Sequence, residues 1–131
     1  MEAALRDAFL TAEDNLKKHV ESMSLHLALA DVWKAIAACD KYIVETAPFK
    51  LWKDEANKER VGEILHVLFD AVRHTARLIG PFMPETAARM AALLNTDPGD
   101  LGQQPPCLGQ SFADGHLLSK PEALFPRIET A

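Results

Sequence analysis

Apolar residues recur at intervals of three and four along the first 94 residues, and almost no stretch alternates as a half-buried strand would. The first such stripe comprises Leu5, Phe9, Ala12, Leu16, Val20 and Met23. The second comprises Leu29, Val32, Trp33, Ile36 and Ile43. This second stripe stops before Pro48, whose ring disfavours helical geometry in the residue that precedes it. The pattern predicts two amphipathic helices, the second of which ends just before Pro48.

The third periodic segment is apolar on more than one side. Its main stripe comprises Val61, Ile64, Leu65, Leu68, Val72 and Ile79. Three further apolar residues lie off that stripe: Val67, Phe69 and Leu78. A helix that is apolar on several sides is typical of the centre of a bundle. Gly80 and Pro81 predict its end, and Pro84 suits the first turn of a fourth, shorter helix.

The composition of the chain changes after Asn95. Residues 95–131 hold five of the eight prolines and four of the six glycines, which favours extended chain over helix. The stretch around Leu124 and Phe125 is apolar enough to dock on the rest of the protein. We therefore predict an all-α fold. It consists of an antiparallel bundle of about four helices over residues 1–94 and a C-terminal extended strap over residues 95–131.

The charge and the cysteine content restrict the class of protein. A formal net charge of −5 argues against a free-standing nucleic-acid-binding domain, since such domains carry a basic surface, so any RNA contact must use a local patch. Charged residues interrupt every long apolar stretch, and the N-terminus lacks the order of a signal peptide. Cys39 and Cys107 are too few for a disulfide framework. We expect a cytoplasmic protein with reduced thiols and no membrane partner.

No group of residues has the pattern of a catalytic or metal site. The five histidines form no close ligand pair with a cysteine or with each other, and we expect His66 and His74 on the rim of the third helix. The six glycines never fall in a phosphate-binding pattern. Asp40, next to Cys39, opposes formation of a reactive thiolate. We therefore predict no catalytic residues, no metal and no cofactor in this chain.

An aromatic pair follows Pro48 and stands among lysines. Phe49 and Trp52 have three lysines near them in the sequence: Lys41, Lys50 and Lys53. Aromatic faces beside cations can hold the unstacked bases of single-stranded RNA. The alternative is structural, with both rings holding the corner at Pro48 against the core, because buried aromatic residues are common. Composition and spacing leave both interpretations open.

Three segments, in order, resemble signatures of the methionyl-tRNA synthetase family. Residues 40–51, D-K-Y-I-V-E-T-A-P-F-K-L, are similar to the N-K/R-Y-I-D-E-T-A-P-W-x-L signature of its helical anticodon-binding domain. Residues 78–87, L-I-G-P-F-M-P-E-T-A, resemble its L-x-P-F-M-P-E-T-A element. Residues 120–129, K-P-E-A-L-F-P-R-I-E, resemble its K-P-x-P-L-F-P-R-I-E element. Related synthetases for aliphatic amino acids share variants of the second element, but the three together, spanning roughly residues 25–129, are specific.

The resemblance implies a helix bundle that reads the anticodon of methionine tRNA. Phe49 stands where the family has a Trp that stacks on an anticodon base, and Trp52 could supply the missing indole. Asp40 replaces the family's Asn and Val44 replaces its Asp, and an exposed carboxylate at position 40 would repel phosphate. The RNA-binding residues expected from the sequence are Pro48, Phe49, Trp52, Lys41, Lys50, Lys53 and Asp40.

The sequence lacks motifs that the family uses for catalysis and for reading the first anticodon base. Neither the HIGH nor the KMSKS signature of the catalytic domain is present, and no segment before Leu25 carries the Asn and Arg that read the first anticodon base in the family. We expect a non-catalytic C-terminal piece of a methionine–tRNA ligase, with ATP binding and ligation in a catalytic domain of the same polypeptide. Its partners would be that domain and the anticodon loop of methionine tRNA. The alternatives are the anticodon domain of another class I synthetase, or a helical protein-interaction module that does not read RNA.

Overall fold

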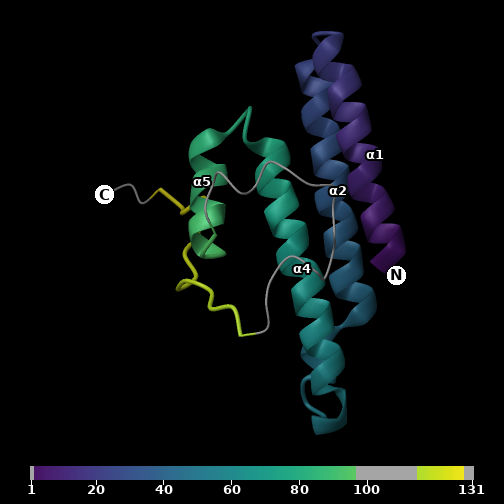
Figure 1. The fold of residues 1–131 in the computed structure, drawn as a ribbon, viewed down its shortest axis with the longest axis vertical. Coiled ribbons are helices and arrows are strands. Elements are labelled where there is room, and N and C mark those ends of the chain that lie inside the picture. The colour runs from purple at the N-terminus through teal and green to yellow at the C-terminus, as the bar shows by residue number, and fades with distance from the viewer. Residues whose placement is uncertain (1, 97–114, 129–131) are drawn as a thin grey trace.

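The computed structural model describes residues 2–96 and 115–128, which form an all-α bundle (Figure 1). Its four long helices are α1 (Glu2–Glu21), α2 (Leu25–Thr46), α4 (Lys58–Ile79) and α5 (Pro84–Leu93). Helices α1 and α2 pack along each other as an antiparallel hairpin, α4 packs against α2, and α5 packs against α4. The prediction of an all-α bundle of about four helices is confirmed.

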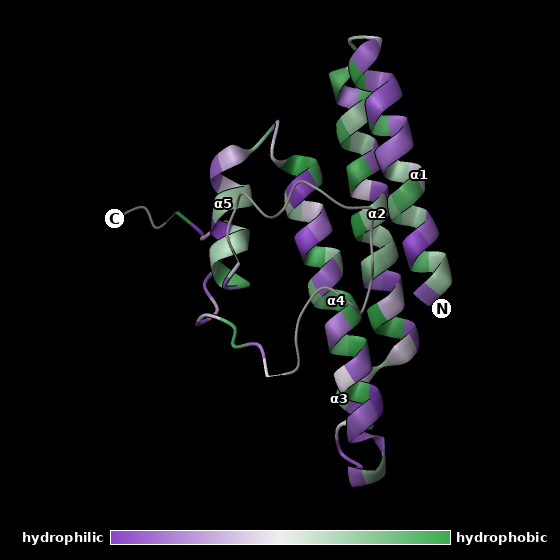
Figure 2. Cartoon of the chain, in the orientation of Figure 1, coloured by the Kyte–Doolittle hydropathy of each residue, from purple (hydrophilic) through white to green (hydrophobic). Residues whose placement is uncertain are grey.

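The helices are amphipathic, and α4 lies at the centre of the bundle. Figure 2 shows hydrophobic and hydrophilic residues interspersed along α1, α2 and α4, and the apolar residues of each helix contribute to one buried core. Among the most deeply buried side chains are Phe9 of α1, Val32 of α2 and Ile64 of α4. Helix α4 contacts α1, α2, α3 and α5, which explains why its sequence is apolar on several sides.

The helix ends fall where the prolines and the Gly-Pro pair predict them. Helix α2 stops at Thr46, α4 stops one residue before Gly80, and α5 begins at Pro84. The connection between α2 and α4 is more ordered than the sequence indicated. It contains a one-turn helix, α3 (Pro48–Leu51), and a 3-10 helix, η1 (Glu55–Asn57).

Some members of the predicted apolar stripes are exposed. Met23 has a φ of 60° in the turn between α1 and α2 and is 82% exposed, because α1 has already ended at Glu21. Trp33 is 53% exposed and Val72 is 39% exposed. Both of these side chains face a groove that the described residues do not fill.

His74 lies inside the bundle, and the expectation that it sits on the rim of the third helix is wrong. Its side chain is buried, and the centroid of its ring lies 6.3 Å from that of Phe9 in α1. Because α1 also packs on α4, this side of α4 is covered. Burial, reinforced by Arg73 and Arg77, lowers the pKa of His74 to about 4. His66 is half-buried.

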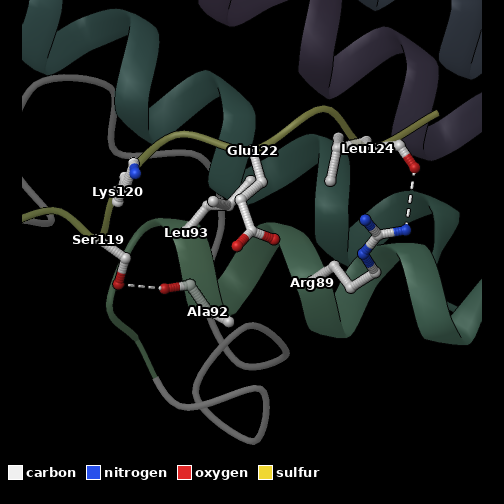
Figure 3. Close-up of a pocket in the computed structure, with 7 residues that line it drawn as sticks. All are labelled: Arg89, Ala92, Leu93, Ser119, Lys120, Glu122 and Leu124. Carbon is white, nitrogen blue, oxygen red and sulfur yellow. Dashed lines mark hydrogen bonds between the residues drawn. The ribbon is translucent and has the colours of Figure 1, made fainter. Parts of the chain in front are cut away.

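The described part of the predicted strap, residues 115–128, runs as extended chain along α5 (Figure 1). At the end of α5, the backbone N–H of Ser119 donates to the carbonyl of Leu93 over 3.1 Å, and its hydroxyl donates to Ala92 O over 2.8 Å (Figure 3). These bonds satisfy carbonyls that a helix end leaves open. The guanidinium of Arg89 donates to the carbonyls of Ala123 and Leu124. Leu124 packs against the core, so the strap docks on α5.

Candidate nucleic-acid interface

The chain turns sharply where α2 meets α3, and we call residues 47–54 the corner. Ala47 adopts left-handed geometry, with φ 43° and ψ 56°, and its N–H donates to the carbonyl of Ile43 over 2.9 Å. Its own carbonyl accepts from the backbone N–H groups of Lys50 and Leu51. Pro48 occupies the first position of α3, where its missing N–H is not needed. The corner is therefore fixed by the backbone itself.

The two aromatic rings of the corner face solvent. Phe49 is 61% exposed and Trp52 is 58% exposed. The apolar residue between them, Leu51, packs against the core instead. Leu51 therefore makes the hydrophobic anchor that the structural alternative assigned to the aromatic pair, and the two rings are available to a ligand.

The lysines near the aromatic rings differ in their surroundings. Lys50 and Lys53 are exposed and make no ion pair with any residue in the described ranges. Lys41 lies 3.7 Å from Glu45, on α2. It lies about 7.5 Å before the end of α2 at Thr46, at 1.5 Å per residue. The structure thus gathers Lys50 and Lys53 with the aromatic pair and places Lys41 outside the corner.

Asp40 also lies on α2 rather than in the corner. Its side chain is exposed and helps to line the groove between α2, α4 and α5. The carboxylate that replaces the family's Asn is therefore set back from the two exposed rings. Its like charge opposes phosphate less there than it would in the corner, because surface charges are screened within about 10 Å at moderate salt.

Lys58 belongs to the same surface, although the sequence did not point to it. Its Nζ lies over the Trp52 ring, 5.4 Å from the ring centroid, and also forms an ion pair with Glu55. Asp54 caps η1 by accepting from the backbone N–H of Ala56 over 3.1 Å. This cap turns the chain back, so that the start of α4 meets Trp52. The six-residue spacing from Trp52 to Lys58 does not place the two on one face of a helix, and the intervening chain has no strand pattern, so no sequence signal marks the pair.

A partly exposed polar network joins the start of α1, the last part of α2 and the start of α4. The hydroxyl of Tyr42 in α2 donates to Glu2 over 2.8 Å, and Arg60 of α4 pairs with the same carboxylate at 2.6 Å. Arg60 also contacts Glu63 at 2.9 Å. Hydrogen bonds from the backbone N–H of Glu2, from Tyr42 and from Arg60 lower the pKa of Glu2 to about 2. The network ties α1, α2 and α4 together next to the corner.

An apolar groove lies beside this surface, between α2, α4, α5 and the strap. It has a volume of about 350 Å³, and Trp33, Ile36, Leu68, Val72 and Phe125 are among the side chains that line it. Cys39 lies in its wall, and burial, together with the charge of Asp40, raises the pKa of this thiol to about 11. Cys107 lies outside the described residues.

The described residues contain neither a cluster of metal-binding side chains nor a membrane-spanning helix. Within residues 2–96 and 115–128, no three side chains able to bind a metal gather at one place. None of the helices in these ranges is both long enough and apolar enough to cross a bilayer.

Comparisons with known proteins agree on one family. Residues 1–131 match the family model described as the anticodon binding domain of methionyl tRNA ligase. The chain is 31% identical over 127 residues to the methionine–tRNA ligase of Fusobacterium nucleatum, covering 95% of this chain and 20% of that protein. It is 33% identical over 125 residues to that of Clostridium acetobutylicum, again covering 95% of this chain and 19% of the relative. The chain therefore spans about a fifth of the length of these relatives.

Solved structures give the same result. The free form of Mycobacterium tuberculosis methionyl-tRNA synthetase is similar with a TM-score of 0.81 and 29% identity, covering 99% of this chain and 26% of that one. The same enzyme in complex with methionyl-adenylate is similar with a TM-score of 0.81 and 31% identity, covering 96% of this chain and 25% of that one.

Proposed function

This chain belongs to the family of anticodon-binding domains of methionyl-tRNA ligase, and from that membership we propose that its corner binds the anticodon loop of methionine tRNA. The observation that carries the proposal is the exposure of Phe49 and Trp52 on a rigid turn beside two lysines without ion-pair partners in the described ranges. Lys50 and Lys53 attract the phosphates, with Lys41 adding charge from α2. An anticodon base then stacks on Phe49, whose position corresponds to the family's Trp.

The family match supports methionine tRNA over the two alternatives left open by the sequence, another class I synthetase or a protein-interaction module. The phenyl ring of Phe49 keeps the π-face of the family's indole with a smaller area. Pro48 shapes the turn that presents it. Asp40 contacts no phosphate in this proposal, because it lies back along α2.

The ligation chemistry belongs to the rest of the polypeptide. A catalytic domain outside residues 1–131 binds ATP and joins methionine to the tRNA, as the names of the relatives support. That part of the ligase covers the apolar groove, where Trp33 is half-exposed in the present chain. The relatives are about five times longer than the matched region, so they have ample chain to do so. The enzyme acts in the cytoplasm.

The substitution Phe49→Ala in the full-length ligase tests the proposed function. Stacking of a base on an aromatic ring is worth about 1–3 kcal/mol, so kcat/KM for tRNA should fall by about tenfold or more. Methionyl-adenylate formation without tRNA should not change, because the ring lies outside the catalytic domain. Phe49→Trp should retain activity, and Leu25→Ala, which removes an exposed apolar side chain at the opposite end of α2, should have no effect. Unchanged tRNA kinetics in folded Phe49→Ala enzyme would refute the role of Phe49.

A further inference from the structure

Trp52 is exposed, yet one face of its indole already has a partner. The ammonium of Lys58 lies over the ring at 5.4 Å from the centroid, a distance at which a cation is attracted to the π-face. The two residues come from different elements, since Trp52 follows α3 and Lys58 opens α4. The contact is therefore made by the fold of the corner and not by neighbouring positions on one helix.

The position of Lys58 has a consequence for RNA binding. A base that stacks on this face of Trp52 must take the place of the ammonium, because both occupy the space directly over the ring. The second partner of Lys58 is Glu55, whose side chain is 84% exposed. An ion pair so open to water adds little, so it does not hold Lys58 in place.

The displaced ammonium remains beside the incoming nucleotide. Lys58 is fixed at the first turn of α4 and its side chain is 43% exposed, so Nζ can swing from the ring towards solvent. A stacked nucleotide carries its phosphate one sugar away from its base. Lysine is suited to this exchange, since its ammonium binds phosphate as a mobile point charge on a flexible stem.

We propose that Trp52 is a second stacking platform of the corner and that Lys58 is a phosphate ligand held on its ring until RNA arrives. A base of the single-stranded loop replaces Nζ on the indole, and the freed ammonium pairs with the phosphate of that nucleotide. The inference rests on the proposed function, because it adds a nucleotide site next to Phe49. It also places a third RNA-facing lysine next to the corner, in addition to Lys50 and Lys53.

The salt dependence of binding measures the phosphate contact. The dissociation constant of full-length ligase for a methionine tRNA anticodon stem-loop is measured between about 50 and 200 mM NaCl. Lys58→Gln should weaken binding several-fold at low salt, and it should reduce the slope of log affinity against log salt by about 0.7, the loss of one contact to a single strand. Lys17→Gln is the matched control. Lys17 also pairs with a glutamate, Glu13, but it lies near the opposite end of α1 from Glu2, which contacts the end of α2 that leads into the corner.

A double-mutant cycle tests whether the two residues act together. Trp52→Leu removes the stacking surface, so binding should weaken by about tenfold. In that background Lys58→Gln should cost less than in wild type, because no stacked nucleotide then brings its phosphate to the ammonium. Additive losses would overturn the exchange.

The binding results for wild type, Phe49→Ala and Lys58→Gln distinguish a wrong role for Lys58 from a wrong assignment of the corner. If the wild-type ligase fails to bind the stem-loop, both are refuted. If binding depends on Phe49 while Lys58→Gln leaves the salt slope unchanged, the anticodon assignment of the corner stands and the role of Lys58 is wrong. Tighter binding of Lys58→Gln with an unchanged slope would show that Lys58 only blocks the ring, which also overturns the proposal.

Discussion

Acid destabilises this protein through His74, whose imidazole lies between α4 and α1. Its pKa in the folded state is about 4, against an ordinary value near 6.5, because burial disfavours the imidazolium and Arg73 and Arg77 oppose it. Asp70 and Glu13 favour the charged form, but their effect is smaller. A proton on Nε2 would have no acceptor among the described residues. Protonation of His74 therefore favours the unfolded chain.

The direction and size of the stability change follow from the pKa of His74 in the folded and in the unfolded chain. Above about pH 6.5 neither state binds the proton, so His74 costs nothing. As the pH falls towards 4, the unfolded chain takes up a proton that the folded chain rejects, and stability decreases. At 1.36 kcal/mol per pKa unit, the loss is about 2.5 kcal/mol by about pH 4.5. Such a loss is a large part of the total stability of a small domain.

Urea unfolding followed by circular dichroism at about pH 7.5 and about pH 4.5 measures this loss. We compare wild type with His74→Met, which is of similar size and cannot take up a proton. Whatever the substitution costs at both pH values, the wild type should lose about 2.5 kcal/mol more than the variant on acidification. Carboxylates remote from His74, such as Glu2, are present in both proteins, so their contribution cancels. Equal losses of unfolding free energy in the two proteins on acidification would refute the role of His74. The control variant His26→Gln changes an exposed histidine and should lose as much as wild type.

Two further predictions concern the corner and the groove. Ala47→Gly should stabilise the chain by about 0.5–1 kcal/mol in urea unfolding, because left-handed geometry costs an L-residue about 1–2 kcal/mol. The extra entropy of glycine in the unfolded chain offsets part of this gain. A destabilised variant would contradict the prediction. Cys39 in a Cys107→Ser chain should react slowly with a maleimide, since its pKa is raised to about 11. In full-length Cys107→Ser ligase, where the rest of the polypeptide covers the groove, Cys39 should react about tenfold more slowly still, as measured by mass spectrometry. Equal rates in the two proteins would contradict the proposal that the groove is covered.

The sequence predicted the helices well, because the signals that specify them are local. Three- and four-residue periodicity marks the apolar faces, and a proline at position 48 or 84 marks an end or a start that no neighbouring element can override. The apolar stretch around Leu124 likewise indicated that the strap would dock. The docking surface on α5 could not be predicted, since it uses the open carbonyls of the helix end and the guanidinium of Arg89.

The contacts that the sequence did not predict all join residues of different structural elements. Tyr42 and Glu2 are 40 residues apart, and their hydrogen bond depends on how α1 and α2 pair. The burial of His74 depends on α1 lying across α4, which no pattern within α4 reveals. The Lys58 contact with Trp52 depends on the turn through η1. Periodicity gives each helix its faces, but only tertiary packing decides which face is covered and by what.

Packing also accounts for an acidic chain with an RNA-binding corner. Three of its carboxylates pair with cations on the bundle: Glu2 with Arg60, Glu13 with Arg77 and Lys17, and Asp31 with Lys34. These contacts lower the pKa of each of the three carboxyls, so they remain ionised and paired at neutral pH. The net charge of −5 therefore includes carboxylates whose charge is offset locally by a paired cation. At the corner the positive charges of Lys50 and Lys53 are not offset in this way, because neither lysine has a carboxylate partner in the described ranges. Attraction to a phosphate falls off within about 10 Å at moderate salt, so this local excess, and not the net charge, determines where RNA binds.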